Sequence, residues 1–274
     1  MHILELLNIE MNKPIAYESF GQSWFHYLSL LLTILLSLWS IKYLKHKSIK
    51  QVKAYMLVFS LILITFEIYK QIIFTYQNSW DYMWYIFPFQ FCSIPMYVGL
   101  VAGLTKSQKI FNASLAFLAT YGLFAGIAVM LYPSDVFVTT MGINIQTMVH
   151  HGGMVVVGIA LIYSGQVKLN LKSFFKAASV FSIVVTIAVL LNTIHNTWIN
   201  EPTFNMFFIN PKYGNHLPIL SSIEPLVNGF IFVIIYYIGF SMVALIVYFM
   251  NLFMINKVDR DLKRLKKLTP KKAI

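Results

Sequence analysis

Long apolar stretches alternate with short polar connections along almost the whole chain. A helix needs about 20 apolar residues to cross the roughly 30 Å hydrocarbon core of a bilayer. The pattern therefore predicts an all-α, polytopic membrane protein with a seven-helix transmembrane bundle. The helices are expected at Phe25–Tyr43, Ala54–Tyr76, Ile86–Leu104, Ile110–Tyr132, Asn144–Tyr163, Phe175–Asn196 and Leu226–Met254.

Composition supports the membrane assignment. The 274 residues are 58% hydrophobic and only 11% charged, and a soluble domain of this length would need more polar surface. The first 20 residues carry Glu5, Glu10 and Glu18 and lack the basic and apolar regions of a secretory signal, so none is expected. The single cysteine, Cys92, excludes an internal disulfide.

The distribution of positive charge predicts the orientation. The net charge is +11, and all 21 lysines and arginines except Lys13, Lys70 and Lys212 lie in alternate connections or in the C-terminal tail. The positive-inside rule makes this side cytoplasmic, so the N-terminus is expected outside and the C-terminus inside. Basic residues placed in this way indicate membrane orientation, and no nucleic-acid partner is expected.

The helices are expected to form one bundle with two flanking segments. Residues 1–24 are predicted to be an external N-terminal segment, 25–254 the bundle, and 255–274 a basic cytoplasmic tail. Such a tail either lies on anionic lipid headgroups or serves only as an orientation anchor. The Gly99-x-x-x-Gly103 and Gly122-x-x-x-Gly126 motifs favour close helix packing within the chain over homodimerisation, and the oligomeric state stays open.

Polar side chains inside the apolar stretches are costly in a bilayer, so each one is a candidate for a site. Under the predicted topology they all fall in the outer half of the membrane, whereas scattered structural residues would not be expected to segregate in this way. The candidates are Glu67, Gln90, Cys92, His150, His151, Asn192 and His195.

These candidates differ in the chemistry that they offer. Cys92 is the only soft nucleophile, although buried cysteines commonly act as small apolar residues. His150 and His151 point about 100° apart on a helix, so only one faces a common pocket easily. Glu67 could orient a histidine, ligate a metal or pair with Lys70.

Two candidates at the end of the sixth helix share one face. Asn192 and His195 are three residues apart, and could either bind substrate or cap the helix. The connection from Trp198 to His216 that follows is too apolar for a free loop, so we expect it to lie at the membrane interface or to fold over the bundle as a lid.

Several short motifs together resemble a known family. Phe87-Pro-Phe-Gln-Phe-Cys92-Ser-Ile resembles the Pro-x-His-x-Cys helix opening of the bacterial YwaF-like integral membrane proteins, and His150-His151-Gly152 matches their later histidine-bearing helix. The segment from Leu191 through Asn196 to Pro202 is similar to that family's Asn-Tyr followed by a loop ending in proline. Gln90 replaces the usual histidine, and Thr197 stands where tyrosine is common.

The resemblance implies a function. YwaF-like proteins look related to an animal multi-pass family implicated in lipid acyl transfer, in which a membrane cysteine and a histidine are catalytic. Carried over to this chain, the resemblance implies Cys92 as nucleophile, His150 as base and a membrane lipid as substrate. Gln90, Asn192 or His195 would then stabilise the oxyanion, and Glu67 would hold the imidazole in one tautomer. No cofactor or metal is expected for this mechanism.

Two other functions use the same residues. Three histidines and Glu67 could bind zinc in an intramembrane hydrolase, although no H-x-x-x-H spacing is present. A transporter or substrate-binding subunit would line an outward-facing polar cavity with them, but no helix is visibly broken near mid-membrane and no inverted repeat is evident. Lysine outnumbers arginine 19 to 2, which is typical of an AT-rich bacterium and predicts a bacterial cytoplasmic membrane.

Overall fold

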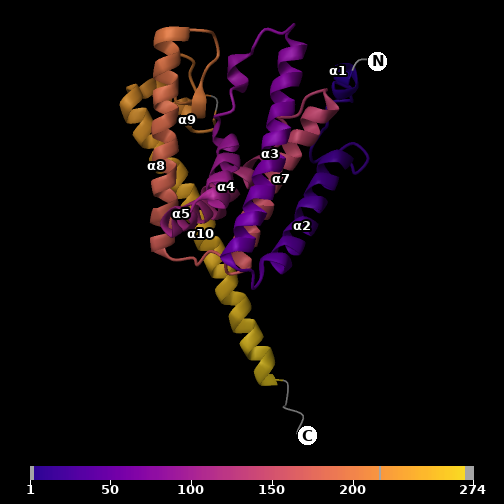
Figure 1. Cartoon of the computed structure of the whole chain (residues 1–274), viewed down its shortest axis with the longest axis vertical. Helices are drawn as coiled ribbons and strands as arrows, with labels where there is room; N and C mark the ends of the chain where they lie inside the picture. Colours follow the sequence, from indigo (N-terminus) through magenta and orange to yellow (C-terminus); the bar gives the residue numbers. More distant parts are fainter. Residues whose placement is uncertain (1–2, 216, 269–274) are drawn as a thin grey trace.

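The computed structural model describes residues 3–215 and 217–268, with side chains through Lys257. In this part of the chain the regular structure is helical, apart from an isolated antiparallel bridge between Glu10 and Thr140. Figure 1 shows the long helices side by side, with one of them, α10, reaching far beyond the others. The prediction of an all-α protein is confirmed.

Six helices in the described part of the chain are long and apolar enough to span a membrane. They agree in position with six of the seven predicted helices, and all bounds lie within a few residues of the expected ones except the C-terminal end of α10. They are α2 (Trp24–Leu44), α3 (Ile49–Gln77), α5–α6 (Gln108–Leu131), α7 (Met141–Tyr163), α8 with its π-helical end (Leu171–Ile199) and α10 (Gly229–Leu268).

The third predicted helix is shorter than expected. Instead of one helix over Ile86–Leu104, short 3₁₀ turns at Trp84–Ile86 and Phe91–Ser93 flank an irregular stretch, and α4 covers only Ile94–Leu104. Pro88 lacks a backbone N–H and disfavours helical geometry at the residue before it, whereas Pro95 sits where proline is tolerated in the first helical turn. The prediction of a continuous helix over Ile86–Leu104 was therefore wrong for the residues before Ile94.

α7 lies at the centre of the arrangement (Figure 1). It packs against α2, α3 and α6, while α3 packs against α4 and α5 against α8. Most of α7 is buried, whereas α2 and α10 expose most of their apolar side chains. Exposed apolar side chains on spanning helices face lipid, so these two helices form the periphery of the bundle.

The glycine motifs are used inside the molecule. A Cβ at Gly99 would lie 2.5 Å from the Ser60 hydroxyl on α3, and one at Gly126 would lie 2.7 Å from the His151 carbonyl on α7. These glycines therefore let neighbouring helices of the same chain approach closely, as the sequence favoured.

The remaining elements are short. α5 (Gln108–Phe117) and α6 (Leu123–Leu131) are joined by a π-helical turn at Leu118–Gly122, and a second π turn, His195–Ile199, ends α8 (Leu171–Ile194). The others are listed here: α1 (Ile3–Leu7), a 3₁₀ turn at Met206–Phe208, α9 (Leu220–Ile223) and a 3₁₀ turn at Glu224–Leu226.

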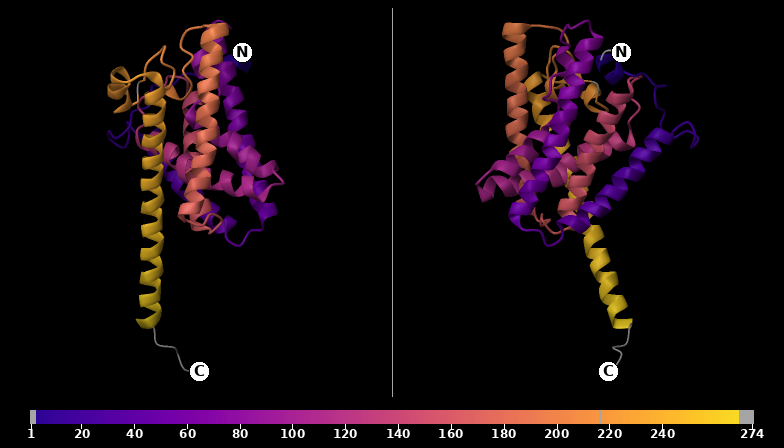
Figure 2. Two further views of the ribbon diagram at one scale, coloured as in Figure 1. Left: turned by 90° about the vertical axis from the view of Figure 1, so that its left-hand side faces the viewer. Right: turned by 45° about the vertical axis from the view of Figure 1, so that its right-hand side comes forward.

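α10 extends beyond its predicted end and carries the first part of the basic tail as helical backbone to Leu268 (Figure 2). The expected contact of the tail with anionic lipid rests on side chains that begin beyond Lys257, and these lie outside the described residues. The orientation and the three-part domain division stay predictions.

Candidate functional site

The segment Trp84–Ser93 before α4, called the irregular stretch from here on, carries Cys92. Side chains from three helices hold it in place. Gln71 on α3 donates to the Ile86 carbonyl at 2.7 Å, and the Tyr97 hydroxyl donates to the Pro88 carbonyl at 2.8 Å. His150 on α7 bonds to the Cys92 carbonyl at 3.0 Å. Non-helical backbone at membrane depth is tolerated only where the protein satisfies its polar groups, and these bonds supply that satisfaction.

The bond to Cys92 fixes the tautomer of His150. A carbonyl oxygen only accepts hydrogen bonds, so Nε2 of the neutral ring carries the proton and Nδ1 holds a lone pair. Nδ1 is buried and has no hydrogen-bond partner within the described residues. The imidazole therefore binds the main chain of Cys92 through Nε2, while the lone pair on Nδ1 is buried and stays unused in the described structure.

The second histidine of the pair has a different partner. His151 donates through Nδ1 to the Thr147 carbonyl of its own helix at 2.8 Å, and its ring centroid lies 5.7 Å from that of His150. Both rings are buried. Of the two, His150 is the one that contacts Cys92.

Glu67 forms the local pair that was one of its expected roles. Its Oε1 lies 2.8 Å from Lys70 Nζ and accepts a hydrogen bond from Gln71 at 2.7 Å. Both charged groups are close enough to Cys92 for electrostatic interaction. Glu67 makes no hydrogen bond to a histidine in the part of the chain that the structure describes.

A tyrosine at the edge of this network extends it towards the surface. The Tyr82 hydroxyl donates to Gln71 at 2.8 Å. Burial, together with the negative charge of Glu67, raises the pKa of Tyr82 to about 12. The phenol therefore stays protonated as a hydrogen-bond donor throughout the physiological range.

Gln90 and Asn192 bind the backbone of the loop after α8. Gln90 donates to the Asn205 carbonyl at 2.9 Å and accepts from the Phe207 N–H at 3.0 Å. Asn192 donates to the Met206 carbonyl at 3.0 Å and accepts from the Met206 N–H at 2.8 Å. In this conformation neither amide is free to bind an oxyanion.

The same loop covers the region around Cys92, as expected for a lid. Phe207 is fully buried, packs 5.7 Å from the Phe91 ring and has a positive φ of 60°. A non-glycine residue in that conformation costs of order 1 kcal/mol. The hydrogen bonds to the Gln90 and Asn192 side-chain amides hold the loop in it. The prediction that this segment folds over the bundle agrees with its position.

His195 lies under this loop and is separated from His150. Its ring stacks on Phe204 with 4.1 Å between centroids and meets Trp84 edge-on at 5.1 Å. It is 1% exposed, and both its nitrogens lack partners among the described side chains. The site residues thus fall into two groups, with Cys92, His150 and Glu67 on one side and Gln90, Asn192 and His195 against the loop.

Sequence reasoning missed Tyr236 on α10. Its side chain is fully buried, it is close enough to Cys92 for electrostatic interaction, and its hydroxyl has no partner in the described structure. The ring stacks 4.3 Å from that of Phe240. Tyr236 lies about two turns into α10 among apolar residues, and nothing in the sequence marks its hydroxyl as buried and unpartnered.

A metal site finds no support in these positions. Within residues 3–215 and 217–257, no three histidine, cysteine, aspartate or glutamate side chains come together in a way that could hold a metal ion. His195 is taken up by the aromatic contacts under the loop, and Glu67 by Lys70 and Gln71.

Comparison with known families completes the description of the site. The sequence model of the TMEM164 family matches residues 20–253, which include every candidate discussed above. The chain belongs to the TMEM164 family. It is therefore a multi-pass integral membrane protein. No match is found among curated proteins or solved structures, and the resemblance to YwaF-like proteins stays a prediction.

Proposed function

We propose that this TMEM164-family protein is a lipid acyltransferase in which Cys92 is the nucleophile and His150 the base. The observation that carries the proposal is the contact between His150 and the Cys92 main chain, which leaves a buried lone pair on Nδ1. A nucleophile paired with an adjacent base is the arrangement that covalent catalysis requires. The resemblance to YwaF-like proteins supports the same roles.

In the first half-reaction, the His150 ring turns from the Cys92 carbonyl so that Nδ1 accepts the proton of the Cys92 thiol, and the thiolate attacks the carbonyl carbon of an acyl ester in a membrane lipid. The S–C bond forms and a tetrahedral oxyanion develops. When it collapses, the ester C–O bond breaks and the leaving alkoxide takes the proton from His150. The products are an acyl thioester on Cys92 and a lysolipid.

In the second half-reaction, the hydroxyl of an acceptor lipid gives its proton to His150 and attacks the thioester carbonyl. The C–S bond breaks, and the Cys92 thiolate leaves and recovers the proton from His150. The acyl chain has then moved from one lipid to another, and the enzyme is unchanged. The Glu67–Lys70 pair lies within electrostatic range of Cys92, where the lysine favours the thiolate and the carboxylate opposes it.

The oxyanion needs a hydrogen-bond donor. The buried and unpartnered hydroxyl of Tyr236 is the donor that we assign to this role. The amides of Gln90 and Asn192, which the sequence suggested, are occupied by the loop backbone and would act there only after the loop moves. In the proposal they hold the lid closed over the site.

The test is detection of the covalent intermediate. Purified protein in vesicles is incubated with phosphatidylcholine that carries a deuterated acyl chain, and the peptide containing Cys92 is analysed by mass spectrometry for a hydroxylamine-sensitive acyl group. Wild type should carry it and Cys92→Ser should not. His150→Gln, which can keep a donor to the Cys92 carbonyl, should reduce its formation by about 100-fold or more.

His151→Gln is the matched control, because His151 bonds only within its own helix. It should leave the thioester within a few-fold of wild type. Equal losses in both histidine variants would contradict the role of His150, and undiminished acyl transfer by Cys92→Ser would reject the cysteine mechanism.

In the described residues, no comparable observation supports the transporter or the zinc-hydrolase alternative. The described residues offer no metal-binding trio. The large cavity of about 940 Å³ between α2, α3 and α7 is apolar and does not include Cys92 or either histidine of the pair.

A further inference from the structure

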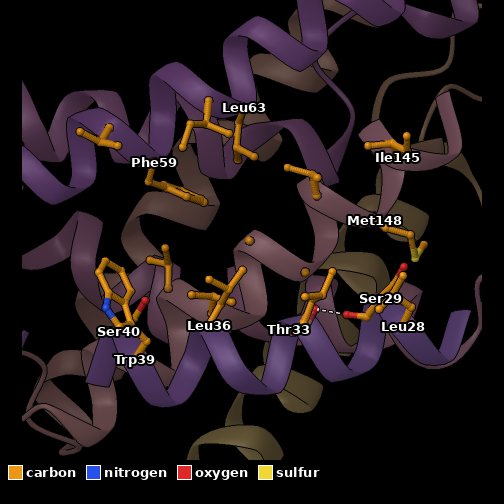
Figure 3. Close-up of a pocket in the computed structure, with 18 of the residues that line it drawn as sticks. Leu28, Ser29, Thr33, Leu36, Trp39, Ser40, Phe59, Leu63, Ile145 and Met148 are labelled. Carbon is orange, nitrogen blue, oxygen red and sulfur yellow. Dashed lines mark hydrogen bonds between the residues drawn. The ribbon is translucent and has the colours of Figure 1, made fainter. Parts of the chain in front are cut away.

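A large groove opens on the side of α7 away from His150. It has a volume of about 940 Å³ and lies between α2, α3 and α7. Figure 3 shows Leu36 and Thr33 of α2 facing Phe59 and Leu63 of α3 across it. Because none of the Cys92 site lines it, the groove is a separate feature of the molecule.

The apolar lining of this groove suits a hydrocarbon chain as its ligand. Its walls are mainly leucine, isoleucine, valine and aromatic side chains on two helices that can span a membrane. The Ser29 and Thr33 hydroxyls donate at 2.8 Å to carbonyls one turn earlier in α2, so neither needs a polar ligand as its hydrogen-bond acceptor. Leu36 and Val58, on opposite rims, are both more than half exposed and meet the lipid phase.

Two glycines of α7 form the floor. A Cβ at Gly152 would lie 2.7 Å from the Thr33 hydroxyl, and one at Gly153 would lie 3.4 Å from the Phe59 ring. Larger residues here would push α2 and α3 away or fill the space between them. The groove is therefore built into the packing of these three helices.

One end of the groove carries aromatic rings and lysines. Trp39 stacks on Tyr43 at 5.3 Å, and the Tyr55 hydroxyl donates to Ser40 at 2.9 Å. Lys47 Nζ lies 4.7 Å from the centre of the Tyr43 ring. Further exposed lysines lie at the end of α2 (Lys42), in the connection that follows it (Lys45) and at the start of α3 (Lys50).

This arrangement matches a phospholipid in shape and charge. Aromatic rings of this kind occupy the level of the headgroups, and clustered lysines next to a spanning helix attract anionic lipid. Running from Trp24 to Tyr43, the groove follows α2 for nearly 30 Å, at about 1.5 Å per helical residue. A lipid tail can therefore lie along it with its headgroup at the lysines.

We propose that the groove holds an acyl chain of one anionic phospholipid, whose phosphate binds the lysines between α2 and α3. The volume of about 940 Å³ is in the range of small-molecule sites. This site is distinct from Cys92 and stands whether or not acyl transfer takes place there. The bound lipid would fill the space between α2 and the rest of the bundle.

Native mass spectrometry of the delipidated full chain in detergent tests the proposal. The protein is titrated with dioleoyl phosphatidylglycerol or with dioleoyl phosphatidylcholine, which have the same tails. We expect one adduct of the anionic lipid, bound about tenfold more tightly than the zwitterionic one, as clustered lysines near a headgroup predict. Equal affinity for the two lipids would overturn the proposal.

A matched pair of variants tests the groove itself. Leu36→Trp places a large ring in the groove and should remove the tight adduct, whereas Ile34→Trp, on an exposed part of α2 outside the groove, should keep it. Val58→Trp on α3 serves the same purpose if Leu36→Trp does not fold. Wild-type affinity in the folded groove variant would reject the site.

A second pair tests the headgroup contact. Lys42→Gln with Lys47→Gln should reduce affinity for the anionic lipid by about tenfold, the order expected when two lysines near a headgroup are lost. Lys172→Gln with Lys176→Gln makes the same change of charge on α8, across the molecule from α2 (Figure 1), and should have little effect. An equal loss in both would overturn the assignment of the lysines.

Discussion

The two faces of α7 differ in where the polar side chains beside them make their hydrogen bonds. On one face, His150 donates to the backbone of a segment 58 residues away in sequence. On the other face, Gly152 and Gly153 form the floor of an apolar groove in which the Ser29 and Thr33 hydroxyls donate within α2. Hydrogen bonds to other segments hold the polar side together. Side-chain packing shapes most of the groove side, where Tyr55 of α3 donates to Ser40 of α2 near one end.

This contrast predicts which substitutions disturb each side. Removing a polar partner near Cys92 leaves a buried group unsatisfied, which costs the full desolvation penalty of that group. Changing the groove side alters volume and contact area, which costs less when the site can relax or is filled by lipid. Perturbations of one face should therefore leave the function of the other face intact.

Lys70→Met is expected to have the largest effect. It leaves the carboxylate of Glu67, which is 4% exposed, without its cation, and breaking a buried pair in this way costs about 3–5 kcal/mol. The apparent free energy of unfolding in detergent measures the loss. Adding Glu67→Leu should recover most of it, because no uncompensated charge remains.

The Lys70→Met protein also sharpens the comparison of the two faces. If it still folds at low temperature, it should form less thioester at Cys92 and bind phosphatidylglycerol as wild type does. A parallel loss of lipid binding would show that the two faces are coupled.

Asn192→Ala should have the next largest effect. It removes both hydrogen bonds to buried Met206 and should cost about 2 kcal/mol, since two main-chain groups lose their partner. Hydrogen exchange of residues 203–210 should accelerate. Thr193→Ala is the control, because its hydroxyl donates only to its own helix, and it should leave exchange in this loop unchanged.

Gly126→Ala tests close packing between α6 and α7. A methyl group there would meet the His151 carbonyl at 2.7 Å, so we expect a loss of about 1–2 kcal/mol in unfolding free energy. Gly122→Ala, whose nearest atoms lie 3.7 Å away, should be tolerated. Equal melting temperatures for the two variants would contradict the packing argument.

The smallest expected effect is the pH dependence that Tyr82 contributes. Its pKa in the folded protein is about 12, against 10.0 for the free side chain, so between these values the unfolded chain has lost a proton that the folded protein keeps. The free energy of unfolding should therefore fall as the pH rises from 10 to 12, with no contribution below 10. Tyr82→Phe should flatten this part of the profile, and an unchanged slope would contradict it.

Hydropathy located most of the fold, because a spanning helix must be apolar over its whole length whatever its neighbours are. Hydropathy did not predict the irregular backbone before α4, because the composition there is apolar. The backbone conformation depends instead on Pro88 and on the side chains that donate hydrogen bonds to it. Hydropathy did not predict the groove either, because its volume depends on how α2 packs against α3 and α7.

The candidate site was predicted by residue type but not by partner. The sequence singled out Cys92 and His150 because such groups are rare in a membrane, and the structure places them in contact through the Cys92 carbonyl. The same reasoning offered Gln90 and Asn192 as donors to a substrate, yet they bind a loop far along the chain. Tyr236 was counted as apolar, because nothing local marked its hydroxyl as unpartnered.

The hydrogen bonds around the irregular stretch have a consequence for natural variation. Gln71, Tyr97 and His150 each bind a carbonyl, which every amino acid possesses, at Ile86, Pro88 and Cys92. The three donors are therefore constrained by their chemistry. The residues that they hold are constrained only by shape or, at Cys92, by the reaction proposed above. A homologue that had lost the thiol would still need a hydrogen-bond donor at the position of His150.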